Sequence, residues 1–313
     1  MILNISGRTD IVQYYTKWLL NRLDAGFVYA RNPMFREKVT RFELSPKTVD
    51  VLVFCSKNYK PLLPYVARII DKFNTYFHYT ITAYGKDIEP GVPEIDQSID
   101  TLIALSEIVG KDRVAWRYDP VLLTRKYTIA RHLETFDRMA EQLAPHIDRC
   151  IFSFVDMYRK LLVNMPEIEP FTFETMDALA KGLGQIAILR GIYLQTCALK
   201  GDYSAYGIHK SGCVTPGILS RANHIEFKSL RFKGMRNNCG CMEWHDFGTY
   251  NTCPNGCKYC YANKNPELAK ESYKLHDPCS PLLLGILNDS DIVTKCKERS
   301  LLKPMDNSVW LDL

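Results

Sequence analysis

Three cysteines near the end of the chain have a spacing that suits a metal cluster. Cys253, Cys257 and Cys260 follow the pattern C-x3-C-x2-C, and Tyr259 directly precedes the third cysteine. Each thiolate of such a loop can hold one iron of a [4Fe–4S] cubane, which leaves the fourth iron open to an outside ligand. S-adenosylmethionine can bind there through its amino and carboxylate groups. The spacing therefore predicts reductive cleavage of S-adenosylmethionine to a radical that abstracts hydrogen from a substrate.

Two other kinds of site fit the same three thiols. A zinc knuckle uses cysteines at similar spacing, and an electron-transfer cluster takes a fourth cysteine from elsewhere in the chain. The corresponding proteins are a zinc-stabilised binding protein and an iron–sulfur electron carrier. A third alternative is a barrel enzyme in which Asp119 and Asp156 perform acid–base chemistry while the metal is structural.

Four further cysteines precede this loop: Cys197, Cys213, Cys239 and Cys241. Four thiolates make a complete tetrahedral set, so we expect a second iron–sulfur cluster or a structural zinc here. In the alternative interpretation, Cys197 is a buried core residue and Cys213 a loop thiol, because free cysteine is commonly buried.

Three polar residues between the two cysteine groups are candidates to support a metal site. Glu243, His245 and Asp246 could orient ligands, act as a ligand or donate a proton, or they could merely cap and solvate the loop. Cys279, in the sequence His276-Asp-Pro-Cys279, is a possible spare ligand.

Short apolar runs alternate with helical spacing over the first 200 residues. The seven predicted strands are Ile2–Ile5, Phe27–Ala30, Val49–Phe54, Phe77–Thr82, Val114–Trp116, Cys150–Phe154 and Ile192–Leu194. This rhythm favours an α/β fold with parallel strands, best a (β/α) TIM-like barrel. Residues 215–233 supply an eighth unit, or the barrel is incomplete. We expect residues 1–233 to form the barrel domain and residues 234–313 a cysteine-rich iron–sulfur tail packed on the barrel mouth.

Polar residues follow several of the predicted strands, where barrel enzymes carry their active sites. Arg8, Arg117 and Asp119 are the candidate catalytic residues. The arginines would bind anionic groups and Asp119 a hydroxyl or amine, facing the open iron. Each could instead cap a helix or form an ion pair at a strand end.

The cysteine pattern with its flanking tyrosine resembles the signature of the radical S-adenosylmethionine superfamily. The stretch from Cys239 to Asn263 also resembles the C-terminal end of an uncharacterised bacterial family, domain of unknown function 1848. Ser6–Asp10 and Trp116–Pro120 resemble that family too. The resemblance supports the cofactor rather than a substrate, with Tyr259 and Asn263 joining the three cysteines as cofactor-binding residues. Unlike most of the superfamily, this chain has its cysteine loop after the barrel.

Composition and charge limit the other classes of function. The net charge is +5, with Lys and Arg scattered among Asp and Glu, so nucleic acid is not indicated as a partner. The start of the chain has no secretory-signal pattern, and no apolar run approaches the length of a membrane span. We expect a cytoplasmic protein, a small-molecule or modified-macromolecule substrate, and a reducing partner such as ferredoxin or flavodoxin.

Overall fold

The fold is built around parallel strands that alternate with helices. The computed structural model describes residues 1–228, 238–297 and 299–303. Its strands are β1 (Ile2–Asn4), β2 (Phe27–Arg31), β3 (Lys38–Glu43), β4 (Val51–Ser56), β5 (Thr75–Thr80), β6 (Val114–Val121), β7 (Arg149–Phe154), β8 (Leu194–Thr196), β9 (His209–Lys210), β10 (His245–Asp246) and β11 (Ile292–Lys295). Its α-helices are α1 (Ile11–Tyr14), α2 (Thr16–Ala25), α3 (Val66–Ile70), α4 (Ile95–Val109), α5 (Ile129–Leu143), α6 (Arg159–Asn164), α7 (Phe173–Arg190), α8 (Pro216–Asn223) and α9 (Pro266–Lys274).

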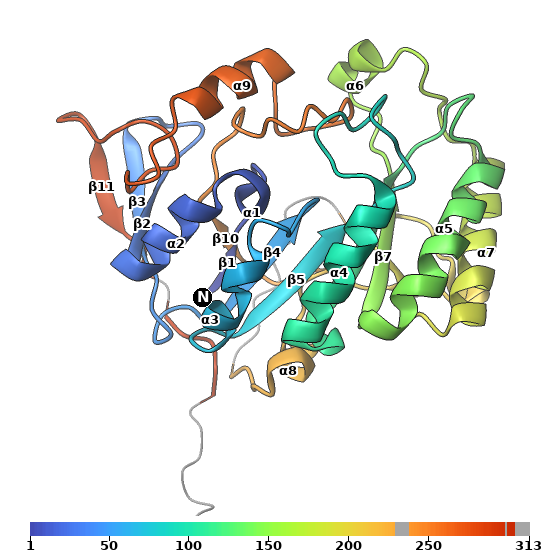
Figure 1. Cartoon of the computed structure of the whole chain (residues 1–313), viewed down its shortest axis with the longest axis horizontal. Helices are drawn as coiled ribbons and strands as arrows, with labels where there is room; N and C mark the ends of the chain where they lie inside the picture. The colour runs from blue at the N-terminus through green and yellow to red at the C-terminus, as the bar shows by residue number, and fades with distance from the viewer. Residues whose placement is uncertain (229–237, 298, 304–313) are drawn as a thin grey trace, which may run out of the picture.

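Eight strands form one parallel sheet with helices around it (Figure 1). The order is β10-β1-β4-β5-β6-β7-β8-β9, and every neighbouring pair is parallel. Six of the seven predicted strands overlap strands of this sheet. The predicted α/β class is therefore confirmed.

The two edges of the sheet also approach each other. The backbone N–H of Met242, which precedes β10, donates to the carbonyl of Val214, which follows β9, at 2.9 Å. A Cβ on Gly212 would lie 2.3 Å from the carbonyl oxygen of Gly240. Pro216–Asn223, within the segment expected to supply an eighth unit, is the helix α8, while residues 229–233 lie outside the described residues.

The prediction that Phe27–Ala30 belongs to the barrel is wrong. It forms β2, which pairs antiparallel with β3 in a separate sheet of order β11-β3-β2. The connection from Arg31 to Lys38 is too short for a crossover helix, so the next strand must run antiparallel. The apolar run correctly indicated a strand but carried no information on its sheet.

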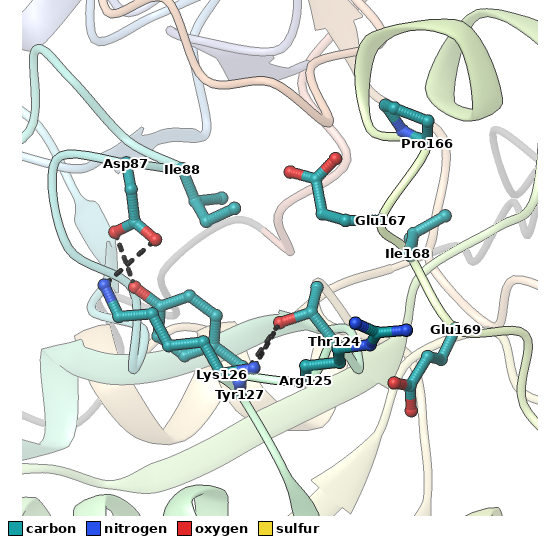
Figure 2. Close-up of a pocket in the computed structure, with 10 residues that line it drawn as sticks. All are labelled: Asp87, Ile88, Thr124, Arg125, Lys126, Tyr127, Pro166, Glu167, Ile168 and Glu169. Carbon is teal, nitrogen blue, oxygen red and sulfur yellow. Dashed lines mark hydrogen bonds and ion pairs between the residues drawn. The ribbon is translucent and has the colours of Figure 1, made fainter.

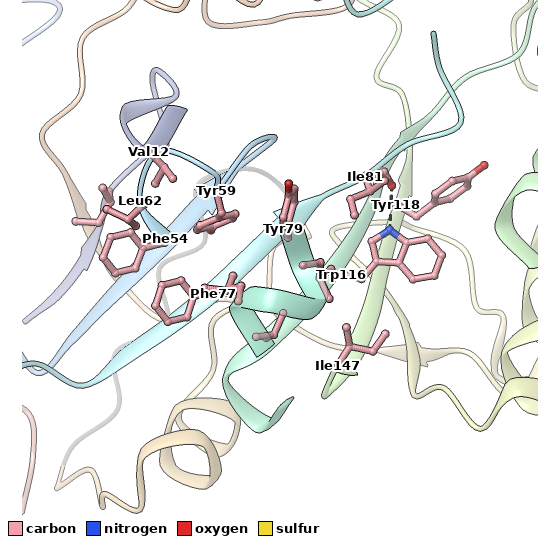
Figure 3. Close-up of a cluster of buried hydrophobic side chains, with 14 of the residues drawn as sticks. Val12, Phe54, Tyr59, Leu62, Phe77, Tyr79, Ile81, Trp116, Tyr118 and Ile147 are labelled. Carbon is pink, nitrogen blue, oxygen red and sulfur yellow. Dashed lines mark hydrogen bonds between the residues drawn. The ribbon is translucent and has the colours of Figure 1, made fainter. Parts of the chain in front are cut away.

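Alternating side chains divide the main sheet into two faces. Phe54, Phe77 and Trp116 pack among the helices in the larger core, where Trp116 Nε1 donates to the carbonyl of Ile81 at 2.9 Å (Figure 3). Val53 and Ala115 lie in a second buried cluster, which also holds several cysteines and residues of α8. The period of two residues in a strand places these sets on opposite faces.

Helix α8 marks the amino-terminal end of the sheet. Its Asn223 accepts a hydrogen bond from the backbone N–H of Thr75, the first residue of β5, at 2.9 Å. None of the helices in the described residues has the length and apolar character that crossing a membrane would require.

Candidate functional site

The segment from Cys253 to Cys260, here called the cysteine loop, lies at the carboxyl ends of the parallel strands. The N–H of Lys258 donates to the carbonyl of Ile88 at 3.0 Å, and Gly91 N–H donates to the carbonyl of Asn255 at 2.8 Å. Ile88 and Gly91 belong to the connection that follows β5. A Cβ on Gly91 would lie 2.7 Å from the Asn255 Cα, so this close approach requires glycine.

Contacts from both sides extend the loop across the strand ends. Tyr15, which follows α1, donates through its hydroxyl to the carbonyl of Thr252 at 2.5 Å. Asn164, at the end of α6, donates to the carbonyl of Lys258 at 3.2 Å. The trace between β10 and α9 runs along the same side of the molecule as α6 (Figure 1). The segment thus bridges connections that follow β1, β5 and β7.

Tyr259 and Asn263 are both anchored beside the thiols. The Tyr259 hydroxyl donates to Glu89, and the Tyr259 carbonyl accepts from the hydroxyl of Tyr158. Asn263 Nδ2 donates to the carbonyl of Cys253 at 2.6 Å. The Asn263 Oδ1 is buried and has no hydrogen-bond partner among the described residues. It is an acceptor that a polar ligand can use.

The three thiols of the loop interact electrostatically with one another. Burial raises the pKa of Cys253 to about 12, with a further contribution from Cys260. Burial also raises the pKa of Cys257. The charge of Glu89 raises this pKa as well, whereas the charge of Lys57 lowers it. Three thiols with this environment ionise when a metal supplies positive charge.

The three thiols of the loop do not converge on a single point. Within residues 1–228, 238–297 and 299–303, no group of three or more His, Cys, Asp or Glu side chains is placed to hold a metal ion. A cubane takes one thiolate per iron, so its ligands need not converge on a single point. A three-cysteine loop with the remaining iron side free fits that donor requirement.

A buried acidic group organises the approach to Cys257. Glu89 is 2 % exposed and accepts from Lys57 Nζ at 2.9 Å and from Thr82 Oγ1 at 2.8 Å, in addition to Tyr259. Lys57 directly follows β4. The pair places a cation and an anion against Tyr259, which lies between Cys257 and Cys260 in the loop.

Arg117 and Asp119 form an ion pair on β6. Asp119 accepts from Arg117 through one carboxylate oxygen and from the Ser153 hydroxyl through the other. Burial lowers the pKa of Arg117. The charges of Asp119, Cys213 and Cys55 outweigh burial and hold this pKa well above its usual value. Arg117 thus lies near the upstream cysteine group as well as near Asp119.

Arg8 forms an ion pair with Asp246 at the first strand end. Its Nε lies 3.6 Å from Asp246 Oδ1, and its guanidinium lies 5.7 Å from the ring centroid of Tyr250. Asp246 also accepts from the N–H of Gly7 at 2.6 Å and of Gly248 at 2.9 Å. Burial raises the pKa of Asp246 to about 6. Asp246 therefore holds β10 against the connection after β1.

The structure brings the four upstream cysteines together. Cys197, Cys213 and Cys241 lie in the second buried cluster, and Cys239 packs against it. The Cys241 sulfur also accepts from the backbone N–H of Cys213 at 3.1 Å and of Val214 at 3.4 Å. Backbone N–H groups directed at sulfur stabilise a thiolate.

The remaining candidates occupy several places in the fold. Cys150 is buried in the core, and Cys279 is exposed. His245 belongs to β10, and Glu243 lies two residues before it. Asp156 lines a cleft of about 540 Å³ whose other residues are Phe154, Val155, Met157, Pro170, Phe171, Met176, Ala198, Leu199, Lys200 and Asn238.

Two residues of that cleft adopt left-handed backbone conformations next to cysteines. Ala198 has φ of 55° and follows Cys197, and Asn238 has φ of 61° and precedes Cys239. Alanine rarely adopts this conformation, and such strain is typical of functional sites. The cleft therefore borders the upstream cysteine group.

A second cleft adjoins the downstream loop (Figure 2). Its volume is about 480 Å³, and its lining comes from Asp87, Ile88, Thr124 to Tyr127, and Pro166 to Glu169. Lys258 Nζ lies 3.4 Å from Glu167 on this wall. The opening is thus continuous with the side of the loop that carries Lys258.

Sequence reasoning missed several residues of the site. Glu89 lies in a long connection, and no pattern in the sequence indicates that it returns to Tyr259. Lys57 was among the polar residues that follow predicted strands, but its pairing with Glu89 was not predicted. Ser153 lies within a strand and had no such signal.

Comparisons with known proteins give one match. A family model described as Domain of unknown function (DUF1848) matches residues 2–262. No curated protein and no solved structure matches the chain.

Proposed function

We propose that this chain, which belongs to the family Domain of unknown function (DUF1848), is a radical S-adenosylmethionine enzyme. Cys253, Cys257 and Cys260 would hold a [4Fe–4S] cluster. The observation that carries the proposal is that these thiols share one loop at the carboxyl ends of the parallel strands, where (β/α) enzymes carry their active sites. Such a cluster supplies one electron for the reductive cleavage of S-adenosylmethionine.

The surrounding residues would bind and orient the ligands. Asn263 Oδ1, buried without a partner in the described part of the chain, would accept from a polar group of S-adenosylmethionine. Tyr259, bonded to Glu89 and Tyr158, would keep the loop in one conformation. Arg117 and Asp119, which both lie on β6, would present polar side chains to the substrate.

Arg8 would act mainly through position. Its ion pair with Asp246 ties the first strand end to β10, and the same region receives the hydroxyl of Tyr261 on the carbonyl of Gly7. Arg8 would thereby keep the connection after β1 in place beside Tyr261. Its remaining N–H groups would be available to an anion.

The upstream cysteines would form a second site in a closed barrel. The bond from Met242 to Val214 supports closure between β9 and β10. Cys197, Cys213, Cys239 and Cys241 would hold a second iron–sulfur cluster, in which each thiolate binds a different iron, and the tail would cover the barrel mouth. In the cytoplasm, ferredoxin or flavodoxin would supply electrons, and a small molecule or a modified group on a macromolecule would be the substrate.

An iron–sulfur electron carrier is the second candidate. The grouping of four cysteines in or against one buried cluster favours it, because carriers close every iron with protein ligands. A carrier would bind iron but would not cleave S-adenosylmethionine.

The test is an anaerobic reconstitution with iron and sulfide, followed by addition of S-adenosylmethionine and dithionite. We expect 5′-deoxyadenosine from the wild type and none from the triple variant Cys253→Ala, Cys257→Ala, Cys260→Ala, which should lose the iron of one cluster. Cys279→Ala is the matched control, because it removes an exposed thiol and should leave both quantities unchanged.

Two results would contradict the proposal. Unchanged iron in the triple variant would show that these thiols hold no cluster. A wild-type protein that takes up iron but yields no 5′-deoxyadenosine would favour the electron carrier.

A further inference from the structure

Two opposite charges lie beside the cysteine loop and contact Tyr259. Lys57 reaches from the end of β4, and its Nζ lies 5.7 Å from the ring centroid of Tyr259. Glu89 reaches from the connection after β5 and pairs with Lys57 at 2.9 Å. The side chains of Lys57 and Glu89 are 14 % and 2 % exposed, respectively, so solvent screens neither charge strongly.

Glu89 is held beside the cysteine loop by two contacts. The backbone N–H of Lys258 donates to the carbonyl of Ile88 at 3.0 Å, and the Tyr259 hydroxyl donates to Glu89. Other bonds fix the two charged residues separately. The backbone N–H of Lys57 donates to Asp10 at 3.0 Å, and Glu89 accepts from Thr82 at 2.8 Å. The strand ends therefore hold the pair beside Tyr259, and the cysteine loop does not position it alone.

We propose that Lys57 and Glu89 are positioning residues that set the reduction potential of the cluster in opposite directions. The inference rests on the proposed function, because it requires the cluster on Cys257. Reduction adds negative charge to a cluster, and nearby charge changes its potential. The ammonium of Lys57 stabilises the reduced form and raises the potential. The carboxylate of Glu89 destabilises that form and lowers it.

A charge-neutralising variant of each residue separates this role from a structural one. Lys57→Met removes the cation and keeps an unbranched side chain, whereas Glu89→Gln removes the anion and keeps an acceptor for Thr82 and Tyr259. Midpoint potentials are measured on the anaerobically reconstituted full chain by a redox titration followed by electron paramagnetic resonance. S-adenosylmethionine is omitted.

We expect the midpoint potential to become more negative in Lys57→Met and more positive in Glu89→Gln. Lys57→Arg, which keeps the cation, should stay near the wild type. Lys258→Met is the matched control. Lys258 is adjacent to Cys257 in the chain, but its side chain is 40 % exposed and pairs with Glu167 at 3.4 Å. Its removal should leave the potential unchanged.

The sign of the two shifts decides the outcome. Equal potentials in the wild type, Lys57→Met and Glu89→Gln would overturn the inference while leaving the cluster in place. Shifts of the same sign in both variants would also overturn it, since they would reflect general disturbance of the loop. A wild type that takes up no iron would overturn the proposed function itself. If Lys57→Met fails to fold, as judged by circular dichroism, the positive shift in Glu89→Gln remains the deciding measurement.

Discussion

Asp246 shows how a buried carboxylate can join distant parts of the chain at a cost that depends on pH. It accepts from the backbone of Gly7 and Gly248 and faces Arg8, and it lies near Tyr261, whose pKa it helps to raise. A Cβ on Gly7 would lie 2.5 Å from Asp246 Oδ2, so a glycine permits this approach. These contacts lower the pKa of Asp246, but burial raises it by more, so that the pKa is about 6.

The raised pKa predicts a pH-dependent stability. The folded state binds the proton more tightly than the unfolded state, in which the pKa is 3.8. The stabilising contribution is therefore complete below pH 3.8 and is lost as the pH rises through 6. Relative to Asp246→Asn, the wild-type free energy of unfolding should fall by at most about 3 kcal/mol between pH 4 and pH 7. Urea unfolding of both proteins across this range measures the difference, and a difference independent of pH would contradict the assignment.

Long apolar strands could be predicted from the sequence, and short edge strands could not. Cys150–Phe154 is a run of buried residues and corresponds to β7. The strands β9 and β10 have two residues each, too few for any periodicity. They exist because partners elsewhere in the chain pair with them, as Leu3 pairs with His245. The small sheet was missed for another reason: the only apolar residues of Lys38–Glu43 are Val39 and Phe42, which are three positions apart and do not follow the two-residue period of a strand.

The candidate site, like the strands, could be predicted only where the signal is local in the sequence. Spacing along the chain suggested the two cysteine groups, and the four upstream cysteines lie in or against one buried cluster, while their role as metal ligands stays a prediction. The partners of Arg8 and Tyr259 could not be predicted, because Asp246 and Glu89 are remote from them in sequence. Local patterns indicate ligands, whereas tertiary packing selects the charges around them.

The close contact between the connection after β5 and the cysteine loop predicts the effect of one methyl group. Gly91→Ala would place a Cβ 2.7 Å from the Cα of Asn255 and force the two segments apart. We expect a destabilisation of about 1–3 kcal/mol and reduced iron content after reconstitution. Gly217→Ala is the control, since its Cβ would meet Arg221 at 3.9 Å in the first turn of α8. Equal iron content and unfolding free energy in both variants would contradict the role of this contact.

The whole molecule places its two cysteine groups in different structural roles. The downstream loop crosses the carboxyl ends of the strands, whereas the upstream group lies in the second buried cluster, with Ile218 and Leu219 of α8. Cys197 follows β8, Cys213 follows the edge strand β9, and Cys241 precedes β10 at the other edge. A metal on these thiols would therefore link the two edges of the sheet.

This arrangement predicts that the upstream group contributes to stability without being needed for the downstream cluster. Replacing Cys239 and Cys241 together by Ala should remove the metal of one site, because half of its ligands are lost. The melting temperature should fall on the order of 4–8 °C if the link contributes about 2 kcal/mol. The open-iron cluster should still assemble, since none of its ligands is changed.

Cys150→Ala is the control for a lost buried thiol and should lower stability without changing the metal content. Metal analysis and calorimetry of the three proteins provide the test, and metal stoichiometry equal to the wild type in the double variant would mean that these thiols bind no metal.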